Sequence, residues 1–294
     1  MKPIRKAVLP VAGFGTRVLP ATKTIPKELL PVVDRPVLQY VVDEAREAGI
    51  EHFIFVTGRQ KNAIEDYFDM SYELEDILQK RNKSDIYSDL VSNRPVEGSM
   101  SFIRQQSAKG LGHAVWCARD VVGNEPFAVL LPDVLVKSQK GCLAQMQDAY
   151  RKTGGNIIAV DSVSTEDVSN YGIVKPKNNQ NYKSQNLFPI DGMIEKPSPI
   201  NAPSNLKITG RYILQPEIMG ILSTQEAGVG KEIQLTDAML KLMKIQEFNA
   251  CVYEGQDFDC GNKLGYLQTV LAYAMDHPEI GDAVRDQVRK INRS

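Results

Sequence analysis

The chain has 294 residues, of which 43% are hydrophobic and 24% are charged, and its formal net charge is −1. This composition is ordinary for a globular protein with a sizeable core, and it excludes the basic field of a nucleic-acid-binding protein and the acidic excess of a disordered one. The four cysteines are far apart in the sequence and lack zinc-ligand spacing, so we expect buried, reduced thiols.

The N-terminal stretch lacks the apolar core and cleavage site of a signal peptide, and no run approaches the roughly 20 apolar residues of a membrane span. We therefore expect a cytoplasmic protein whose partners include neither a membrane nor nucleic acid.

Short apolar runs alternate with amphipathic stretches in the first half of the chain, which is typical of βα units in a mostly parallel sheet. Strands are predicted at 6–11, 52–57, 126–133, 156–163 and 206–214. Helices are predicted at 36–48, across the charged stretch 60–83, from near His113, and at 279–291. The polar stretch 176–189 is predicted to be an exposed loop or hairpin. No repeat or linker divides the chain, which favours one domain.

A glycine-containing loop follows the first predicted strand. Gly13 and Gly15 are followed by Thr16 and Arg17, with Lys27 further along. Glycines allow backbone N–H groups to approach an anion, arginine offers a planar fork for phosphate oxygens, and lysine supplies a compact charge. The loop lacks the third glycine of the dinucleotide-binding pattern and the Gly-Lys-Ser/Thr of the P-loop. It indicates a phosphate site of another kind.

The stretch 9–31, LPVAGFGTRVLPATKTIPKELLP, resembles the signature of sugar-1-phosphate nucleotidyltransferases. Its run ATKTIPKE at 21–28 is similar to that of the bacterial UTP–glucose-1-phosphate uridylyltransferases within this family. Further matches in the same order extend the resemblance over nearly the whole chain: FDMSYELE at 68–75, AKGLGHAV at 108–115, LPD at 131–133, IEKP at 194–197, GRYIL at 210–214, QLTDA at 234–238 and FDCGNKLGYLQ at 258–268.

This resemblance implies an α/β fold: a Rossmann-like nucleotidyltransferase fold with a mixed, mostly parallel central sheet, flanking helices and a small sugar-binding lobe. Within the single domain 1–294, it implies a nucleotide-binding half at about 1–135, a sugar-binding half at about 136–262 and C-terminal helices at about 263–294. The implied reaction joins UTP and glucose 1-phosphate into UDP-glucose and releases pyrophosphate.

The resemblance also assigns nucleotide-binding residues. The nucleotide lies against Ala12 and Gly13, and the uracil is surrounded by Glu28, Gln105 and Gly110. Uracil presents two carbonyl acceptors and one N–H donor, so a glutamine and backbone groups suit its edge. Without the resemblance, Glu28 would be read as a solvated charge and Gln105 as a loop amide.

Sugar and phosphate contacts are assigned in the same way. Gly172 places its backbone against the sugar, Glu195 accepts hydrogen bonds from glucose hydroxyls, and Lys196 binds and orients the sugar phosphate. Arg17 and Lys27 are expected to stabilise the departing pyrophosphate. In isolation, Glu195 and Lys196 would be exposed loop charges.

Two acidic residues are candidate ligands of Mg²⁺. Asp133 ends the most apolar predicted strand, where α/β sheets place their ligand crevice, and Mg²⁺ takes one or two carboxylates plus substrate phosphates. A turn-forming aspartate is the alternative. Asp259 matches the second acidic position of the family.

Several alternatives stay open at this stage. The same chemistry on dTTP or another sugar 1-phosphate is the nearest one, and a non-catalytic regulatory relative is another, although such relatives lose the Thr-Arg pair that is present here. Family members are commonly oligomeric, which implies a homodimer or homotetramer. The apolar face of the C-terminal helix fits a subunit contact and packing on its own domain equally well.

Overall fold

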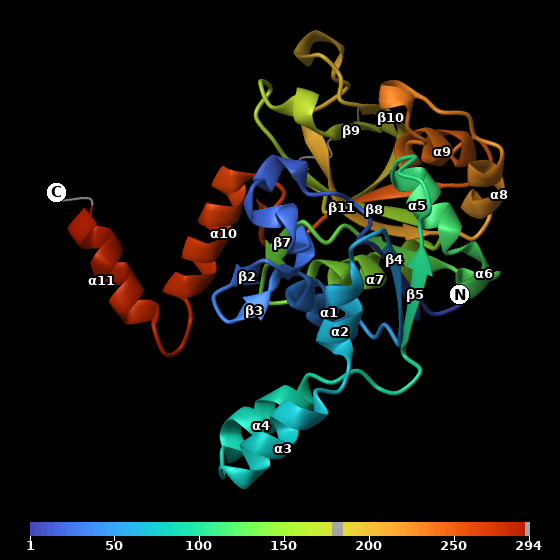
Figure 1. The fold of residues 1–294 in the computed structure, drawn as a ribbon. Helices are drawn as coiled ribbons and strands as arrows, with labels where there is room; N and C mark the ends of the chain where they lie inside the picture. Colours follow the sequence, from blue (N-terminus) through green and yellow to red (C-terminus); the bar gives the residue numbers. More distant parts are fainter. Residues whose placement is uncertain (178–184, 292–294) are drawn as a thin grey trace.

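A nine-stranded mixed sheet lies at the centre of the computed structural model, which describes residues 1–177 and 185–291 (Figure 1). In spatial order its strands are β5 (Met100–Arg104), β4 (His52–Thr57), β1 (Lys6–Pro10), β6 (Phe127–Leu130), β11 (Leu206–Leu214), β8 (Asn156–Ser162), β12 (Phe248–Val252), β10 (Leu187–Glu195) and β9 (Gly172–Pro176). The predicted mixed α/β sheet is confirmed.

Strand direction changes at β11. The neighbours β5, β4, β1 and β6 are parallel, as are β8 and β12, whereas β11 runs antiparallel to both β6 and β8. Strand β10 pairs antiparallel with β12 and with β9. The parallel part therefore comes mostly from the first half of the chain, where the sequence alternates between strands and helices.

Helices cover both faces of the sheet, so its central strands must be apolar throughout. All four residues of β6 are fully buried. On one face the core includes α1 (Val37–Glu47) and α7 (Cys142–Thr153), and on the other it includes α5 (Leu111–Cys117), α8 (Ile218–Ser223) and α9 (Leu235–Leu242). The predicted strands at 6–11, 52–57, 156–163 and 206–214 and the helix at 36–48 are confirmed, to within a residue at their ends.

The remaining elements are short or peripheral. A two-stranded sheet joins β7 (Val134–Lys137) to β13 (Gln256–Asp259), and another joins β2 (Pro31–Val32) to β3 (Arg35–Pro36). The other α-helices are α2 (Asn62–Phe68), α3 (Tyr72–Lys80), α4 (Ser84–Ser92), α6 (Arg119–Val122), α10 (Lys263–Met275) and α11 (Gly281–Ile291). Single 3₁₀ turns span Thr16–Val18, Ala21–Lys23, Lys27–Leu29, Val168–Asn170, Pro199–Asn201 and Val229–Lys231.

Three predicted boundaries differ from the structure. The helical stretch 60–83 is divided into α2 and α3, because Asp69 adopts an extended conformation after α2, and the unpredicted helix α4 follows. The strand at 126–133 ends at Leu130, where the chain turns away before β7. Of the predicted loop or hairpin at 176–189, residues 178–184 lie outside the described residues, and the strands on either side pair antiparallel.

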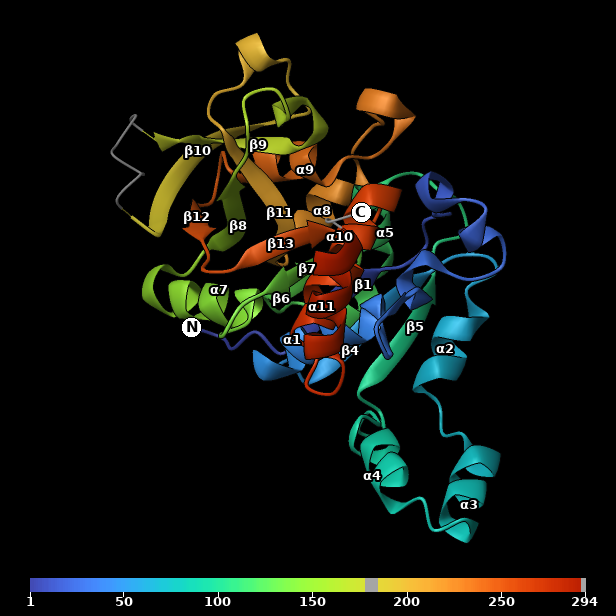
Figure 2. The same ribbon diagram turned by 90° about the vertical axis from the view of Figure 1, so that its left-hand side faces the viewer.

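Two parts project from the body. Helices α3 and α4 form a hairpin beyond α2, and α10 leads through a tight turn into α11, which contacts α10 near that turn and then diverges from it (Figures 1 and 2). The four cysteines are free thiols, and three of them are buried. Within the described ranges, no helix combines the length and apolarity needed to cross a membrane.

Helix α10 starts against β13 through a close contact at Gly265. A Cβ atom there would lie 2.0 Å from the carbonyl oxygen of Asp259, whereas a Cβ on Gly220 in α8 would meet nothing within 4 Å. Alanine normally favours a helix over glycine by about 0.5–1 kcal/mol. Gly220→Ala is therefore expected to stabilise the protein.

Gly265→Ala is expected to destabilise the protein by about 1–3 kcal/mol, because the added methyl group forces β13 and α10 apart. Urea denaturation of both variants measures the two signs, with Gly220→Ala as the matched control. Equal effects of the two substitutions would contradict this account of the α10–β13 contact.

Candidate active site

The two predicted acidic residues are brought together by the small β7–β13 sheet. Asp133 lies in the turn between β6 and β7, and Asp259 is the last residue of β13, paired opposite Val134. The Cys260 N–H donates to the Asp133 carbonyl over 2.7 Å. A Cβ on Gly261 would lie 2.8 Å from Asp259 Oδ1 and 3.1 Å from Asp133 Oδ2, so both carboxylates border one small space.

The cations of the glycine loop reach the same carboxylate. Lys27 Nζ donates to Asp133 Oδ2 over 2.6 Å, and Arg17 Nη2 lies 3.9 Å from that oxygen. Burial opposes ionisation of Asp133, but Lys27 and Arg17 outweigh it and hold its pKa below the usual value. Likewise, Asp133 outweighs the effect of burial on Lys27 and raises the pKa of that ammonium.

Gly15 allows the loop to fold tightly enough for these contacts. Its φ of +65° is in the left-handed region, and a Cβ there would lie 3.2 Å from Lys27 Cβ. The Thr22 hydroxyl donates to the Gly15 carbonyl over 2.8 Å and holds the loop in place. A side chain at position 15 would be strained at this φ and would crowd the side chains of Lys27 and Thr22.

A cavity of about 210 Å³ opens beside this charged cluster. Among the predicted site residues, its walls contain Arg17, Asp133, Gly172, Glu195 and Asp259. The Cβ position of Gly172 is 3.2 Å from Glu195 Oε2, which accepts a hydrogen bond from the Thr236 hydroxyl over 2.8 Å. The structure therefore places the predicted sugar-binding pair and the predicted metal ligands around one cavity.

Lys196 occupies a different position. It follows directly after β10, its φ is +48°, its side chain is exposed, and it is not part of the cavity wall. Its N–H donates to the Tyr171 carbonyl over 3.0 Å, and Tyr171 does line the cavity. The backbone at Lys196 is thus fixed beside the cavity, while its side chain is exposed to solvent.

Among the predicted nucleotide-binding residues, Ala12 and Gly13 follow β1, Gln105 directly follows β5, and Gly110 precedes α5. Gln105 Nε2 donates to the Gly110 carbonyl over 3.1 Å and lies 3.0 Å from His113 Nδ1. A Cβ on Gly58, after β4, would lie 3.0 Å from the Ala12 carbonyl, so the chain after β4 lies against the glycine loop. Leu111, next to Gly110, lines the same cavity as Asp133.

Glu28 differs from the solvated charge that the bare sequence suggests. It is 1% exposed and forms an ion pair with Lys61, with 2.6 Å between Oε2 and Nζ. Burial raises the pKa of Glu28 although Lys61 and Lys27 counteract it. Its Oε1 is buried and accepts no hydrogen bond from the described residues. A carboxylate oxygen in this state is suited to accept an N–H from a ligand.

Some residues around the cavity were not identified from the sequence. Lys207 and Asp257 form an ion pair over 2.7 Å in the cavity wall, and Lys207 lies over the Tyr171 ring. The sequence did contain a signal for Lys207, which stands within the apolar strand LKITGRYIL. A charged side chain in a buried strand needs a partner of opposite charge. Lys61 carried no comparable signal, since it stands in a polar stretch.

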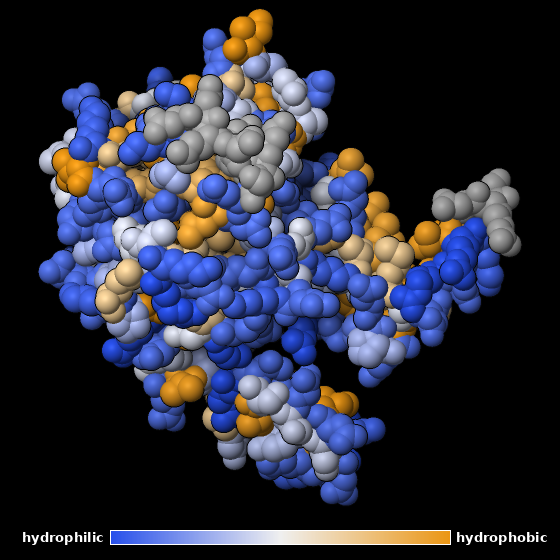
Figure 3. Space-filling model, turned by 180° about the vertical axis from the view of Figure 1, so that it is seen from behind, coloured by the Kyte–Doolittle hydropathy of each residue, from blue (hydrophilic) through white to orange (hydrophobic). Residues whose placement is uncertain are grey.

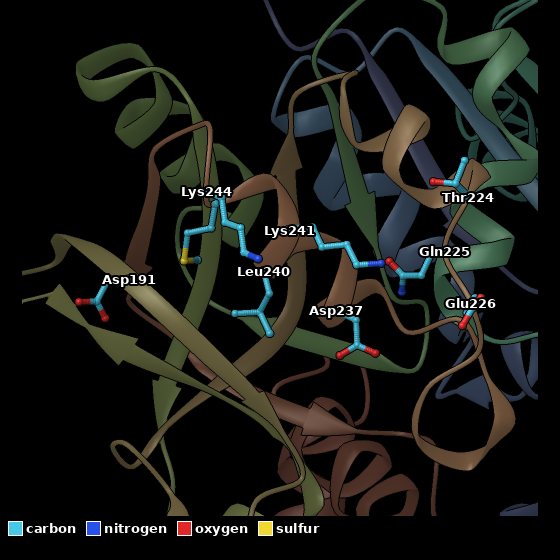
Figure 4. A pocket seen from close by; sticks show the side chains of 9 residues that line it. Asp191, Thr224, Gln225, Glu226, Asp237, Leu240, Lys241 and Lys244 are labelled. Carbon is cyan, nitrogen blue, oxygen red and sulfur yellow. The ribbon is translucent and has the colours of Figure 1, made fainter.

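A larger open pocket of about 800 Å³ lies beside α9 (Figure 4). Its side chains come from α9 and the two residues after it, from the loop after α8 and from Asp191 on β10, and they include both lysines and carboxylates. None of the residues predicted from the sequence lines it. The smaller cavity is the candidate active site, because there two carboxylates, two cations and a glycine loop converge.

The donor set beside Gly261 fits a magnesium ion that shares its ligands with a substrate. Among the described residues no group of three His, Cys, Asp or Glu side chains could hold a metal alone. The carboxylates of Asp133 and Asp259 are hard oxygen donors, and Mg²⁺ is usually held by one or two carboxylates together with substrate phosphates.

Comparison with known proteins gives a consistent result. The nucleotidyl transferase family model matches residues 6–275. The UTP–glucose-1-phosphate uridylyltransferase of Komagataeibacter xylinus is 48% identical over 264 residues, covering 90% of this chain and 92% of that protein.

Solved structures of similar proteins agree. A UTP-bound UGPase from Acinetobacter baumannii has a TM-score of 0.89 at 45% identity, covering 97% of this chain and 98% of that one. A UDP-glucose pyrophosphorylase complexed with UDP-glucose has a TM-score of 0.82 at 42% identity, covering 93% and 100%. The chain therefore belongs to the nucleotidyl transferase family of enzymes.

Proposed function

We propose that this protein is a UTP–glucose-1-phosphate uridylyltransferase, which forms UDP-glucose and pyrophosphate from UTP and glucose 1-phosphate. The observation that carries the proposal is the convergence of Lys27, Arg17, Asp133 and Asp259 beside a cavity that Glu195 also lines. Such a site suits a reaction between two phosphate-bearing substrates next to a sugar. The names of relatives at 42–48% identity support the choice of substrates.

The nucleotide is assigned to the half of the chain at about 1–135. Ala12 and Gly13 hold it through their backbone, and Glu28, Gln105 and Gly110 surround the uracil. An ionised Glu28 can only accept hydrogen bonds, so the N–H of the uracil edge is its natural partner. The Gln105 amide supplies a donor for a uracil carbonyl.

The sugar phosphate is assigned to the half at about 136–262. Gly172 lies against the sugar, and Glu195 accepts from glucose hydroxyls. Lys196 orients the attacking phosphate, for which its side chain must swing inward from its exposed position beside the cavity. A crystal structure with UDP-glucose bound tests these contacts residue by residue, and sugar bound away from Gly172 and Glu195 would refute them.

The reaction needs alignment and charge neutralisation, with no protein nucleophile. A phosphate oxygen of glucose 1-phosphate attacks the α-phosphorus of UTP, and the bond to the β-phosphate oxygen breaks as pyrophosphate leaves. Arg17 and Lys27 neutralise the leaving pyrophosphate, and Lys196 holds the attacking group in line. Asp133 and Asp259 would hold Mg²⁺, which supplies additional positive charge to the phosphate oxygens.

Asp133 keeps Lys27 charged and in place until substrate arrives. In the structure the Lys27 ammonium donates to Asp133 over 2.6 Å. Triphosphate oxygens entering the cavity offer this ammonium new acceptors, and the Asp133 carboxylate, once released, would be available as a ligand for Mg²⁺. Lys27 and Asp133 are therefore partners of each other without substrate, and each takes a new partner when substrate binds.

We also propose that the protein forms a homodimer or homotetramer through the α10–α11 arm. Leu264 and Leu267 on α10 are 66% and 54% exposed, and Ile291 on α11 is 70% exposed. Figure 3 shows apolar residues in orange along this arm, where it leaves the body. Burial of such a surface against a second copy would remove it from water.

The reaction is assigned to the cytoplasm. Four free cysteines suit a reducing compartment, where thiols stay unpaired. Cell fractionation tests this assignment, and recovery of the protein from a compartment other than the cytoplasm would refute it.

The first test measures pyrophosphate release from the purified protein with glucose 1-phosphate and Mg²⁺. Release is expected with UTP and is expected to stop with EDTA. With dTTP, kcat/KM is expected to be lower by about 10- to 200-fold, because one methyl group in a pocket is worth roughly 1–3 kcal/mol. Equal rates with dTTP would reassign the nucleotide, and no release despite UTP binding would refute catalysis.

Lys27→Ala is expected to lower kcat by about a hundredfold or more, as removal of a transition-state hydrogen-bond donor does. Lys27 helps to hold the pKa of Asp133 below its usual value, so its loss raises that pKa. The residual activity of the variant should therefore fall at a higher pH than wild-type activity does as the pH is lowered, because Asp133 becomes protonated sooner. Lys140→Ala, which removes a lysine paired with Asp148 outside the site, is the control. A nearly normal kcat for Lys27→Ala would remove it from the mechanism.

Val288→Glu is expected to reduce the size of the oligomer, because it places a charge on the apolar face of α11. Gln287→Glu changes an exposed position of the same helix and is the matched control. Light scattering after size-exclusion chromatography measures the mass of each variant. A monomeric wild-type protein, or a Val288→Glu variant of unchanged size, would argue against this surface.

A further inference from the structure

Arg211 is a fully buried cation that the proposed reaction does not use. It lies on β11, 0% exposed, directly after Gly210, whose φ is +75°. The pairing of β11 with β8 is irregular between Ile208 and Tyr212, so the strand is distorted at the position of Arg211. Its neighbours Gly210 and Tyr212 in the GRYIL motif line the candidate cavity, whereas Arg211 does not and has no role assigned above.

The guanidinium forms a forked ion pair with Glu44 of α1. Arg211 Nη2 donates to Glu44 Oε2 over 2.8 Å, and Arg211 Nε donates to Glu44 Oε1 over 3.1 Å. Glu44 Oε1 also accepts from the Leu143 N–H at the start of α7 over 3.0 Å. Burial disfavours the charged guanidinium, but Glu44 outweighs that effect and raises the pKa of Arg211.

The same guanidinium also binds the turn that carries Asp133. Arg211 Nη1 donates to the Leu131 carbonyl over 3.0 Å, and Arg211 Nη2 donates to the Val134 carbonyl over 2.8 Å. These two carbonyls lie on either side of Asp133 in the sequence. The turn is thereby fixed from within the core at both ends.

We propose that Arg211 is a positioning residue for Asp133, holding the 131–134 turn so that the carboxylate faces Lys27 and Asp259. This inference rests on the proposed role of Asp133 in the reaction. Arg211 itself does not line the cavity. It acts through the backbone of the turn, in a chain of contacts from α1 to the active site.

A purely stabilising role is the simpler explanation, and two features speak against it. Burying an ion pair is costly, and apolar residues of similar volume often stabilise a core as well or better. Moreover, two of the three N–H donors that Glu44 leaves free bind carbonyls of the one turn that bears Asp133, and the third makes a longer contact of 3.4 Å to the Gly210 carbonyl of its own strand. The planar fork of arginine is needed for this, since the single ammonium of lysine cannot reach the same carbonyls and Glu44 together.

The test is a double-mutant cycle on kcat. Arg211→Lys is expected to lower kcat about tenfold or more while the KM for UTP changes less than about threefold, because a displaced group costs the chemical step more than binding. The same substitution in the Asp133→Asn background should change kcat less than about twofold, since residues that act as a unit are not additive.

Two further variants keep the test decisive. Glu44→Gln weakens the hold on the guanidinium while leaving an acceptor for Leu143, and it replaces Arg211→Lys in the cycle if that variant does not fold. Arg94→Lys is the matched control, because it alters an arginine whose partner, Glu75, is also buried but lies in the α3–α4 hairpin. It should leave kcat unchanged. Each assay is run well below the melting temperature of its variant.

Two results would overturn the inference. If Arg211→Lys lowers kcat equally in the Asp133 and Asp133→Asn backgrounds, Arg211 acts through general stability. If kcat of Arg211→Lys is normal, the turn does not need the planar guanidinium to hold Asp133 in place. Failure of the proposed function is distinguishable, because it appears as a wild-type protein without pyrophosphate release. In that case, hydrogen exchange at the Cys260 amide, which donates to the Asp133 carbonyl, reports whether Arg211→Lys loosens the turn.

Discussion

A guanidinium buried at the centre of the protein joins the parts on which the site depends. Arg211 of β11 binds Glu44 of α1 and the two carbonyls of the turn before β7, and Glu44 in turn binds the first turn of α7. Because a charge in a low-dielectric core needs every partner in good geometry, these four segments are held in one arrangement. The position of the active-site turn follows from that requirement.

Electrostatic pairing explains how a chain with a net charge of −1 can handle highly anionic substrates. No field of the whole protein attracts them, so local cations must. Lys27, Arg17 and Asp133 are held together by the tight turn at Gly15 and by their own charge pairing. In the absence of substrate, Lys27 and Arg17 thus lie beside the Asp133 carboxylate. Phosphate oxygens can replace that carboxylate as their partner.

Much of the site and of the fold could be predicted from the sequence. Continuous apolar runs such as FAVL gave strands, and resemblance in several motifs pointed to Asp133, Asp259, Gly172 and Glu195, four residues that the structure places around one cavity. The pairing of Glu28 with Lys61 and of Lys207 with Asp257 could not be predicted, because the partners are 33 and 50 positions apart. Such ion pairs form only when the fold brings distant segments together, and no local sequence pattern shows which segments will be neighbours.

The sequence by itself determined the alternating α/β elements and the family, and it predicted a phosphate site at the glycine loop, because periodicity, glycine positions and motif order are local properties of the chain. Only the tertiary structure decided that Glu28 is buried, that Lys196 starts beside the cavity and that Arg211 holds the Asp133 turn. These facts depend on burial and on long-range contacts. A charge is solvated or paired according to its neighbours in space, and the packed fold alone brings those neighbours together.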